Sequence, residues 1–302
     1  MNILVTGGTT FVSRYTAEYF VKQGHTVFVL NRGTKPQSDG VYFIKGDRHN
    51  LDDLLSAYKF DVVIDVTAYT GADVSDLLSG LGEFGQYILI SSSAVYRETL
   101  SQPFNENQPC GKNIHWGAYG TNKIAAEEVL LSKVPNAYII RPPYLYGPMN
   151  NLYREAFIFD CAENDLPVYI PKNGDLQLQF YHVFDLCMFI NKLIDIRPHE
   201  HIFNVGNSDT VSIREWVTGC YSVVGKMPEF IAVDSAIPAR TYFPFRDYEY
   251  VLDVTKQNAI LPAVIPLEEG LRESYSWYKD HSEEVLKKDY FTVIKEKIER
   301  TL

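Results

Sequence analysis

The chain has 302 residues, 46% of them hydrophobic, and a formal net charge of −10. This length and apolar content are enough to bury a large core in one domain or in two interlocked ones. The acidic balance argues against a nucleic-acid partner, because proteins that bind phosphate backbones gather Lys and Arg on one face. The first residues begin an apolar strand pattern and no stretch reaches membrane-spanning length, so we expect a cytoplasmic protein with no membrane partner.

Short apolar runs alternate with helix-period segments through the first half of the chain. This alternation predicts an α/β fold with a doubly wound parallel (Rossmann) sheet and helices on both of its faces. The expected strands are residues 3–5, 27–30, 42–44, 62–66, 87–90 and 137–140, with a later strand beginning at Ile202. The expected helices among them are residues 12–22, 51–58, 72–84 and 118–131.

From Pro142 onward the pattern becomes irregular and rich in Pro, Tyr and Asn. We expect a smaller C-terminal substrate-binding lobe of residues 144–177 with 206–302, and a dinucleotide-binding domain of residues 1–143 with 178–205. Residues 283–302 have the pattern of an amphipathic charged helix, which predicts a surface cover or the contact of a homodimer. The remaining helical candidates are residues 152–163, 184–196, 213–224 and 267–279.

A glycine turn at Gly7 joins the first expected strand to the first expected helix. Gly7 permits the tight turn, and the N–H groups at the start of the helix favour an anion such as a pyrophosphate. A full glycine fingerprint would place glycines at positions 7, 10 and 13, whereas this chain has Thr10 and Ser13. On this motif alone, a dinucleotide site and an ordinary strand-to-helix turn are equally good interpretations. The candidate cofactor contacts in the turn are Gly7, Thr9, Thr10 and Phe11.

The second and third expected strands end in residues that bear on which dinucleotide binds. NAD enzymes usually end the second strand with an acid that binds the ribose, but this chain has Asn31 and Arg32. An arginine there can bind a 2′-phosphate, so the cofactor is NAD or NADP and the choice stays open. Asp47 follows the third strand, where it could accept a hydrogen bond from the adenine or simply end a turn. Ala68, after the fourth strand, is a further candidate cofactor contact.

Tyr119 and Lys123 stand four residues apart in an expected helix, so their side chains lie on one face. Three serines, Ser91 to Ser93, follow an expected strand upstream. Spacing alone would not be informative, because Tyr275 and Lys279 have the same separation. Only the first pair follows a strand that ends in serines, at the edge where parallel sheets bind ligands. This order predicts a phenol, an ammonium and a hydroxyl around a nicotinamide.

Several longer stretches together resemble the extended short-chain dehydrogenase/reductases of the nucleotide-sugar epimerase/dehydratase family. The Thr10 substitution and the turn at Asn31 also resemble a divergent branch of that family, which includes chloroplast proteins that bind RNA. The matching stretches are residues 6–8, 91–96, 119–123, 141–148, 182–185, 203–206 and 266–271.

The resemblance implies roles for individual residues. It places Ser92 at the family's catalytic Ser/Thr position, Tyr119 as the base that removes a sugar hydroxyl proton, and Lys123 as the charge that favours the phenolate. Pro142 and Tyr144 fall in a segment that packs against the nicotinamide. Family dehydratases follow the catalytic Ser or Thr with an Asp-Glu pair. This chain has Ser93 and Ala94 there, which favours epimerisation.

The candidate substrate contacts are Ser93, Asn151, Arg154 and Arg246, of which the two arginines could bind a diphosphate. Surface or packing roles explain Asn151, Arg154 and Arg246 equally well. No metal site is expected, because the four cysteines are scattered and the two histidines at 199 and 201 lie in an expected turn.

Three functions follow in order of preference. The first is a nucleotide-sugar epimerase, similar to UDP-sugar 4-epimerases, that acts by transient hydride transfer to bound NAD(P). The second is an NAD(P)-dependent sugar reductase or dehydrogenase. The third is a non-catalytic scaffold associated with nucleotides or RNA, for which Thr10 and Ser13 are the evidence.

Overall fold

The structure, a computed structural model, describes residues 1–234 and 236–300. The chain divides into two compact units. The first comprises Met1–Pro143, Val183–Gly206 and Leu252–Val264, and the second comprises Tyr144–His182, Asn207–Val251 and Ile265–Leu302. The expected division differs in three places: residues 178–182 belong to the second unit, whereas Gly206 and residues 252–264 belong to the first.

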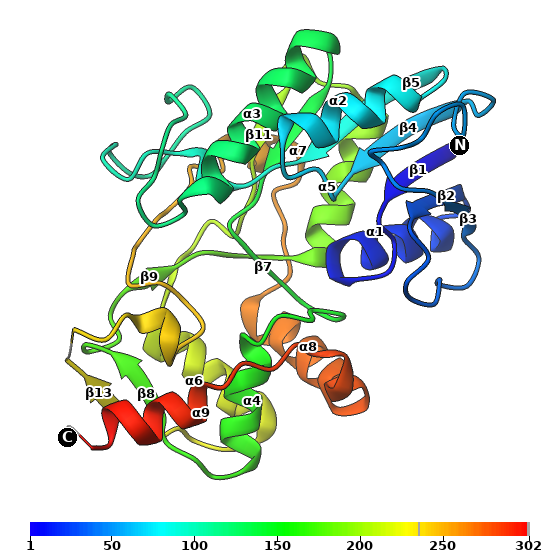
Figure 1. The fold of residues 1–302 in the computed structure, drawn as a ribbon. Coiled ribbons are helices and arrows are strands. Elements are labelled where there is room, and N and C mark those ends of the chain that lie inside the picture. The colour runs from blue at the N-terminus through cyan, green and yellow to red at the C-terminus, as the bar shows by residue number, and fades with distance from the viewer. Residues whose placement is uncertain (235, 301–302) are drawn as a thin grey trace. The chain divides into compact units, whose positions relative to one another are not determined.

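The first unit is built on a parallel sheet of seven strands in the order β11-β6-β5-β4-β1-β2-β3 (Figure 1). This confirms the predicted doubly wound Rossmann sheet. All seven expected strands are present. Their bounds are β1 Asn2–Thr6, β2 Thr26–Asn31, β3 Tyr42–Lys45, β4 Phe60–Asp65, β5 Phe84–Ile90, β6 Tyr138–Arg141 and β11 Ile202–Asn204.

Helices cover both faces of this sheet, α2 beside α3 on one face and α1 beside α5 on the other (Figure 1). Strand side chains such as Leu4, Val63 and Leu89 share a fully buried cluster with Leu77 of α2 and Leu130 of α3. The apolar burial that this arrangement provides is the main stabilising force of the unit. The helices of the unit are α1 Phe11–Lys22, α2 Gly71–Gly80, α3 Ala118–Lys133, α5 Val183–Ile196 and α7 Thr255–Ile260, with a 3-10 turn, η1, at Ser93–Val95.

The helix predicted over residues 51–58 is absent, and the segment forms consecutive turns instead. Leu54, Ser56 and Tyr58 each donate a backbone hydrogen bond to the residue three positions earlier. Leu51 and Leu55 are nevertheless buried in the core cluster. Their spacing resembled a helix because both side chains point to the core. The predicted helix 72–84 was also too long, because Phe84 begins β5.

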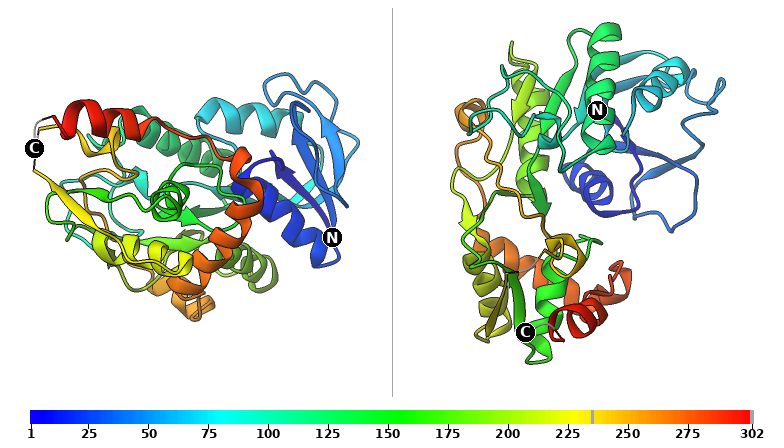
Figure 2. Two further views of the ribbon diagram at one scale, coloured as in Figure 1. Left: turned by 90° about the horizontal axis from the view of Figure 1, so that it is seen from below. Right: turned by 60° about the vertical axis from the view of Figure 1, so that its left-hand side comes forward.

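The second unit packs three helices, α4 Glu155–Glu163, α6 Ile213–Val224 and α8 Leu267–His281, against one another (Figures 1 and 2). Short strand pairs accompany them, and the sequence analysis missed these strands because each has only two to four residues. They are β7 Tyr144–Tyr146 with β10 Phe180–His182, β8 Val168–Pro171 with β13 Phe230–Val233, and β9 Gln177–Leu178 with β12 Val211–Ser212.

The C-terminal segment is not the single helix predicted over residues 283–302. It contains a 3-10 turn at Ser282–Glu284, the short helix α9 at Tyr290–Val293 and a π-helical turn at Ile294–Ile298. Residues 301–302 lie outside the described part of the chain. Among the residues that the structure describes, no helix is both long and apolar enough to cross a bilayer.

Candidate active site

The turn between β1 and α1 has the backbone form that a phosphate cradle requires. Gly7 and Gly8 have φ angles of +92° and +88°, which side-chain-bearing residues rarely adopt. A Cβ atom on Gly8 would lie 2.5 Å from Val29. Helix α1 then begins with Thr10 as an N-cap residue whose side chain makes no capping hydrogen bond. The first N–H groups of α1 therefore have no side-chain cap, which fits an anionic pyrophosphate.

The two non-glycine residues of the fingerprint fit this turn. The Ser13 hydroxyl donates a hydrogen bond of 2.9 Å to the Thr10 carbonyl and is buried. A Cβ on Gly7 would lie 2.8 Å from that hydroxyl, so the missing side chain at Gly7 makes the room that Ser13 occupies. Close packing of helix and strand is thus achieved without a glycine at position 13. Thr9 is half-buried in the turn, and Phe11 is the buried first residue of α1.

Asn31 holds the turn at the end of β2. Its amide nitrogen donates to the Gly7 carbonyl at 2.7 Å, and its amide oxygen accepts from the Gly33 N–H at 2.9 Å. Arg32 is exposed beside it, and the Lys35 ammonium donates to the Thr10 hydroxyl at 3.3 Å. The end of β2 therefore presents the cations Arg32 and Lys35, and the Asn31 amide is already hydrogen-bonded within the turn. No acid stands at the position where NAD enzymes usually bind the ribose.

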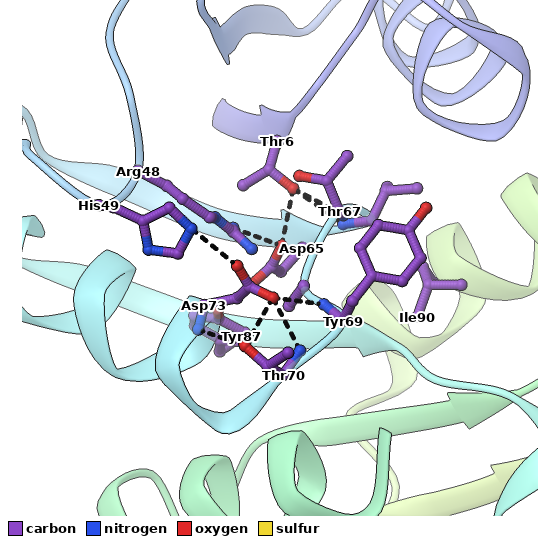
Figure 3. Close-up of polar contacts among 12 residues, drawn as sticks. Thr6, Arg48, His49, Asp65, Thr67, Tyr69, Thr70, Asp73, Tyr87 and Ile90 are labelled. Atoms are coloured by element: carbon purple, nitrogen blue, oxygen red, sulfur yellow. Dashed lines mark hydrogen bonds and ion pairs between the residues drawn. The ribbon is translucent and has the colours of Figure 1, made fainter. Parts of the chain in front are cut away.

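Asp47 takes the turn role, since its carboxylate accepts a hydrogen bond of 3.1 Å from the His49 N–H and the residue is exposed. Its contact with an adenine stays a prediction. The neighbouring Arg48 belongs to a buried network that the sequence analysis missed (Figure 3). Its guanidinium pairs at 2.8 Å with the fully buried Asp65, the last residue of β4. Thr6 and Tyr87 each donate a hydroxyl hydrogen bond of 2.7 Å to the same carboxylate.

This network joins the carboxyl ends of β1 and β4 to the middle of β5 and to the loop after β3. The Thr6 hydroxyl also accepts from the N–H groups of Val66 and Thr67 at 3.0 and 3.1 Å. The loop after β4 is therefore fixed where it leaves the sheet. An acid at the end of an otherwise apolar strand was the sequence signal that could have found the network, because a buried charge requires a partner.

Helix α3 carries Tyr119 and Lys123 and is anchored by residues on one face. At Gly120 a side chain would collide with the Ala94 carbonyl of η1, so the glycine allows α3 to lie directly against that turn. One turn beyond Lys123, Glu127 accepts from Arg141 Nε at 3.0 Å and also from the Ser91 hydroxyl. Because residues three and four apart share a helical face, these anchors fix the direction in which Lys123 points.

Lys123 is 2% exposed, and its ammonium donates to the carbonyls of Ala68 and Ile90 at 2.7 and 2.9 Å. These two carbonyls lie just after β4 and at the end of β5, so Lys123 bridges the exits of adjacent strands. Burial lowers the pKa of Lys123 to about 8, against the opposing influence of Asp65 and other nearby carboxylates. The ammonium has three N–H donors, and one remains for a ligand hydroxyl.

Tyr119 lies at the start of α3 and is 40% exposed. Its ring centroid is 6.4 Å from that of Tyr69 and 6.4 Å from that of Trp116. Ser92 follows β5 and caps η1, where its hydroxyl accepts from the Ala94 N–H at 3.2 Å. Since Gly120 of α3 lies directly against Ala94 of η1, Ser92, Tyr119 and Lys123 belong to segments that meet at one edge of the sheet.

Hydrogen bonds and an ion pair also fix the segments that follow β5 and β6. The buried Ser93 donates its N–H to the Pro142 carbonyl at 3.0 Å. Arg141 forms a buried ion pair with Glu127, and its guanidinium donates to the Tyr96 hydroxyl at 2.9 Å. Burial opposes the charge of Arg141, but Glu127 outweighs it and raises the pKa of the guanidinium. Neither charge of this pair is available to a ligand.

The second unit contains the remaining predicted contacts, which are Tyr144, Asn151, Arg154 and Arg246. The Arg154 guanidinium lies 5.0 Å from the centroid of the buried Tyr144 ring, and the Phe245 ring lies 4.6 Å from the same ring. Burial raises the pKa of Tyr144, and the positive charges of Arg154, Arg240 and Arg246 oppose the rise. Tyr144 therefore lies against Arg154 and within the electrostatic influence of Arg240 and Arg246, and its contact with a nicotinamide stays a prediction.

Arg240 and Lys288 join this group and were missed by the sequence analysis. Arg240 donates to the Pro244 carbonyl next to Phe245. Burial and the positive charges of Arg240, Arg154 and Arg246 lower the pKa of Lys288. Across residues 1–234 and 236–300, no carboxylate lies within ion-pair distance of Arg154, Arg240 or Lys288. We call Arg154, Arg240, Arg246 and Lys288 the cation cluster. Asn151 is half-buried and its carbonyl accepts from Leu286 at 2.9 Å.

Comparisons with known proteins show the family and the fold of this chain. The profile of the NAD dependent epimerase/dehydratase family matches residues 3–206. The chloroplast stem-loop binding protein of 41 kDa b from Arabidopsis thaliana is 31% identical over 300 residues, which cover 91% of this chain and 78% of that protein. The UDP-glucose 4-epimerase of Halalkalibacterium halodurans is 24% identical, with 93% of this chain and 96% of the relative covered.

Solved structures of similar fold include the UDP-glucose 4-epimerase of Thermotoga maritima with UDP-glucose, with a TM-score of 0.75 at 18% identity. The UDP-glucuronic acid 4-epimerase of Bacillus cereus, in complex with UDP-glucuronic acid and NAD, gives a TM-score of 0.73 at 19% identity. Each alignment covers 93% of this chain and 99% of the other. The chain belongs to the NAD dependent epimerase/dehydratase family, which is of the short-chain dehydrogenase/reductase type.

Proposed function

We propose that this protein is a nucleotide-sugar 4-epimerase that works through a bound NAD(P). The observation that carries the proposal is the buried Lys123 ammonium, held by two carbonyls at the exits of β4 and β5, with Tyr119 one turn earlier on the same helix. Two relatives named as UDP-glucose 4-epimerases support the choice of reaction. The shared fold supports it less strongly, because one fold hosts many reactions.

The chain's own residues would handle the proton of the reacting sugar hydroxyl. Tyr119 accepts that proton, and the nearby Lys123 ammonium stabilises the phenolate that Tyr119 must present. The Ser92 hydroxyl donates a hydrogen bond to the sugar oxygen as it becomes a carbonyl. The third N–H of Lys123 binds a ribose hydroxyl of the dinucleotide. A bound nicotinamide would supply the hydride chemistry that inverts the sugar carbon.

The residues after Ser92 favour epimerisation over dehydration. Water elimination needs an acid and a base next to the sugar, and Ser93 and Ala94 supply neither. Both are buried, with the Ser93 N–H engaged by Pro142. An oxidised sugar intermediate in this site would therefore receive its hydride back rather than lose water.

The cation cluster is the proposed site for the diphosphate of the substrate. Arginine forks bind phosphate oxygens bidentately, and a diphosphate offsets the mutual repulsion of closely spaced cations. Phe245 and Tyr144 beside the cluster offer aromatic faces to a nucleotide base. Arg154 and Arg246 are the predicted members of this site, and Arg240 and Lys288 extend it.

NADP is the proposed cofactor. Arg32 and Lys35 are cations at the end of β2, where a 2′-phosphate would lie, and Asn31 already uses its amide to hold the turn. A ribose with free hydroxyls would find no carboxylate acceptor there.

Recovery of a dinucleotide from the purified protein tests the proposal most simply. An epimerase regenerates its nicotinamide in every turnover, so denaturing the protein should release NADP or NAD, and UDP-glucose should be converted without added dinucleotide. A reductase, the second candidate, would convert substrate only with a stoichiometric supply of reduced dinucleotide. Absence of bound dinucleotide, together with no binding on titration, would contradict both.

A scaffold associated with RNA is the third candidate, favoured by the 31% identity to a stem-loop binding protein. The net charge of −10 opposes it. The two interpretations differ in their dependence on Tyr119. Its replacement by Phe removes a hydroxyl from an exposed ring, so an RNA-binding scaffold would retain its activity and an epimerase would lose it.

A further inference from the structure

Tyr69 is an aromatic residue beside two of the proposed proton-transfer groups, and the proposed function gives it no role. It follows Ala68 in the loop after β4. The Lys123 ammonium lies 4.9 Å from the centroid of its ring, and the Tyr119 ring centroid lies 6.4 Å from it. The residue is 53% exposed. One tyrosine side chain therefore contacts both the proposed base and its cation.

The backbone of Tyr69 is held firmly, although the residue is half exposed. Its N–H donates to Asp73 Oδ2 at 2.9 Å, and the same oxygen accepts from the Thr70 N–H at 2.7 Å. Asp73 and Thr70 together form the capping box that begins α2. His49 lies 3.2 Å from the other oxygen of Asp73. The loop thus presents the Tyr69 ring from a rigid base.

The other charges that act on Lys123 are engaged elsewhere. Asp65 of β4 pairs with Arg48, which follows β3, and it also accepts from Thr6 and Tyr87. Glu127, on α3 itself, pairs with Arg141, and Asp73 of α2 is committed to the capping box. The groups left to stabilise the ammonium directly are two carbonyls and the face of the Tyr69 ring. An aromatic face attracts a cation most strongly where water is excluded, as it is around this buried lysine.

We propose that Tyr69 is a positioning residue of the hydride-transfer site, whose ring holds the Lys123 ammonium in place beside the Tyr119 ring. The inference rests on the proposed function, because it assigns Tyr69 to the proton transfer that this function requires. The ring, rather than the hydroxyl, carries the role, since the contacts with Lys123 and Tyr119 are both made by the ring.

The test compares Tyr69→Phe, which keeps the ring, with Tyr69→Leu, which removes it. Tyr42→Leu is the matched control, because Tyr42 is 59% exposed on β3 of the same unit and its ring lies beside that of Phe28, 5.3 Å away between centroids. Two quantities are measured for each variant. The first is the titration midpoint of Lys123, followed by NMR of lysine labelled at Cε and assigned with Lys123→Arg. The second is the pH profile of kcat/KM with UDP-glucose, and thermal unfolding confirms that each variant is folded.

The ring stabilises the charged form of Lys123, so its loss should lower the midpoint. We expect Tyr69→Leu to shift both the midpoint and the alkaline fall of kcat/KM downward by about half a unit to one unit. Tyr69→Phe and Tyr42→Leu should leave both unchanged.

The two readouts separate the possible failures. Midpoints that are equal in wild type and Tyr69→Leu would overturn the proposed role of Tyr69 even if the enzyme is an active epimerase. A shift in Tyr69→Phe as large as in Tyr69→Leu would also overturn it, because the hydroxyl would then be responsible. A wild-type protein with no hydride transfer would contradict the proposed function and the positioning role with it, whatever the midpoint shows.

Discussion

The two units contain two different arrangements of positive charge at their proposed functional sites. In the first unit the buried cations have partners: Arg141 pairs with Glu127 at 2.5 Å and Arg48 pairs with Asp65 at 2.8 Å. In the second unit the cations of the cluster lie close to one another, and none of Arg154, Arg240 and Lys288 has a carboxylate within ion-pair distance in the described part of the chain. A paired buried charge completes the architecture, whereas we propose that Arg154, Arg240 and Lys288 bind an anion that comes from outside.

Breaking a pair in the first unit should have the largest effect. Glu127→Gln leaves the Arg141 guanidinium buried without its counter-charge, which costs about 3–5 kcal/mol of unfolding free energy. Urea unfolding of the variant and the wild type measures this cost. The double variant Glu127→Leu, Arg141→Met should recover most of the loss, because both charges are then absent. A Glu127→Gln variant as stable as wild type would contradict the account of the pair.

Removing a cation from the cluster should affect binding rather than stability. Arg154→Met keeps an apolar side chain over Tyr144 and should weaken binding of UDP-glucose by about tenfold to a hundredfold, as expected for loss of a charge-assisted hydrogen bond. The free energy of unfolding should change by less than about 0.5 kcal/mol.

Calorimetric titration with UDP-glucose measures the affinity of this variant. Lys172→Met is the control, because Lys172 is an exposed cation of the same unit that already pairs with Asp247 at 2.8 Å. Equal losses of affinity in the two variants would show that general charge, and not the cluster, attracts the substrate.

Lys123 differs from both the buried ion pairs and the cation cluster, since its ammonium is buried but is held mainly by carbonyls. Its pKa is lowered to about 8 by burial, so its charge is present at neutral pH and is lost as the pH rises through that value. We expect kcat/KM to fall on the alkaline side near pH 8. Lys123→Arg should have low activity without this fall, because a guanidinium stays charged. A profile that is flat through pH 9 in the wild type would contradict the requirement for the ammonium.

The smallest effect is expected at the exposed end of β2. Lys35→Met should weaken NADP binding by about fivefold to tenfold and leave NAD binding unchanged, because an exposed cation contributes only about 1 kcal/mol to a phosphate contact. Fluorescence titration with each dinucleotide measures the two affinities. An equal loss for both would place Lys35 at the pyrophosphate and not at a 2′-phosphate.

The sequence predicted the first unit well because repeated strands and helices leave strong periodic patterns. Lys123 and Tyr119 could be placed on one face of α3 from their spacing, and Ser92 at the exit of β5 from the strand before it. The Tyr275 and Lys279 pair has the same spacing, yet its side chains lie on α8, with Lys279 over the Tyr275 ring at 5.2 Å. The strand before Tyr119 and Lys123 therefore distinguished this pair from Tyr275 and Lys279, and the spacing of four residues did not.

The features that escaped prediction depend on contacts between distant segments. Leu51 and Leu55 are buried as in a helix, but the segment between them folds as turns. Asp65 and Arg48 are separated by a strand and a loop, and their pairing has no local pattern. Arg240 and Lys288 reach the cation cluster through tertiary packing of short elements. The hydrophobic periods of about two residues for strands and about 3.6 residues for helices indicate local structure, and they do not indicate contacts between distant segments.

The central claim is that Tyr119, Lys123 and Ser92 serve a reversible hydride transfer between a nucleotide sugar and a bound dinucleotide. The most direct measurement mixes UDP-glucose with protein loaded with oxidised dinucleotide and follows the absorbance of reduced nicotinamide, in wild type and in Tyr119→Phe. The account predicts a transient reduction in the wild type and its loss by a factor of about a hundred or more in the variant. Equal reduction in both proteins, or none in the wild type, would contradict it.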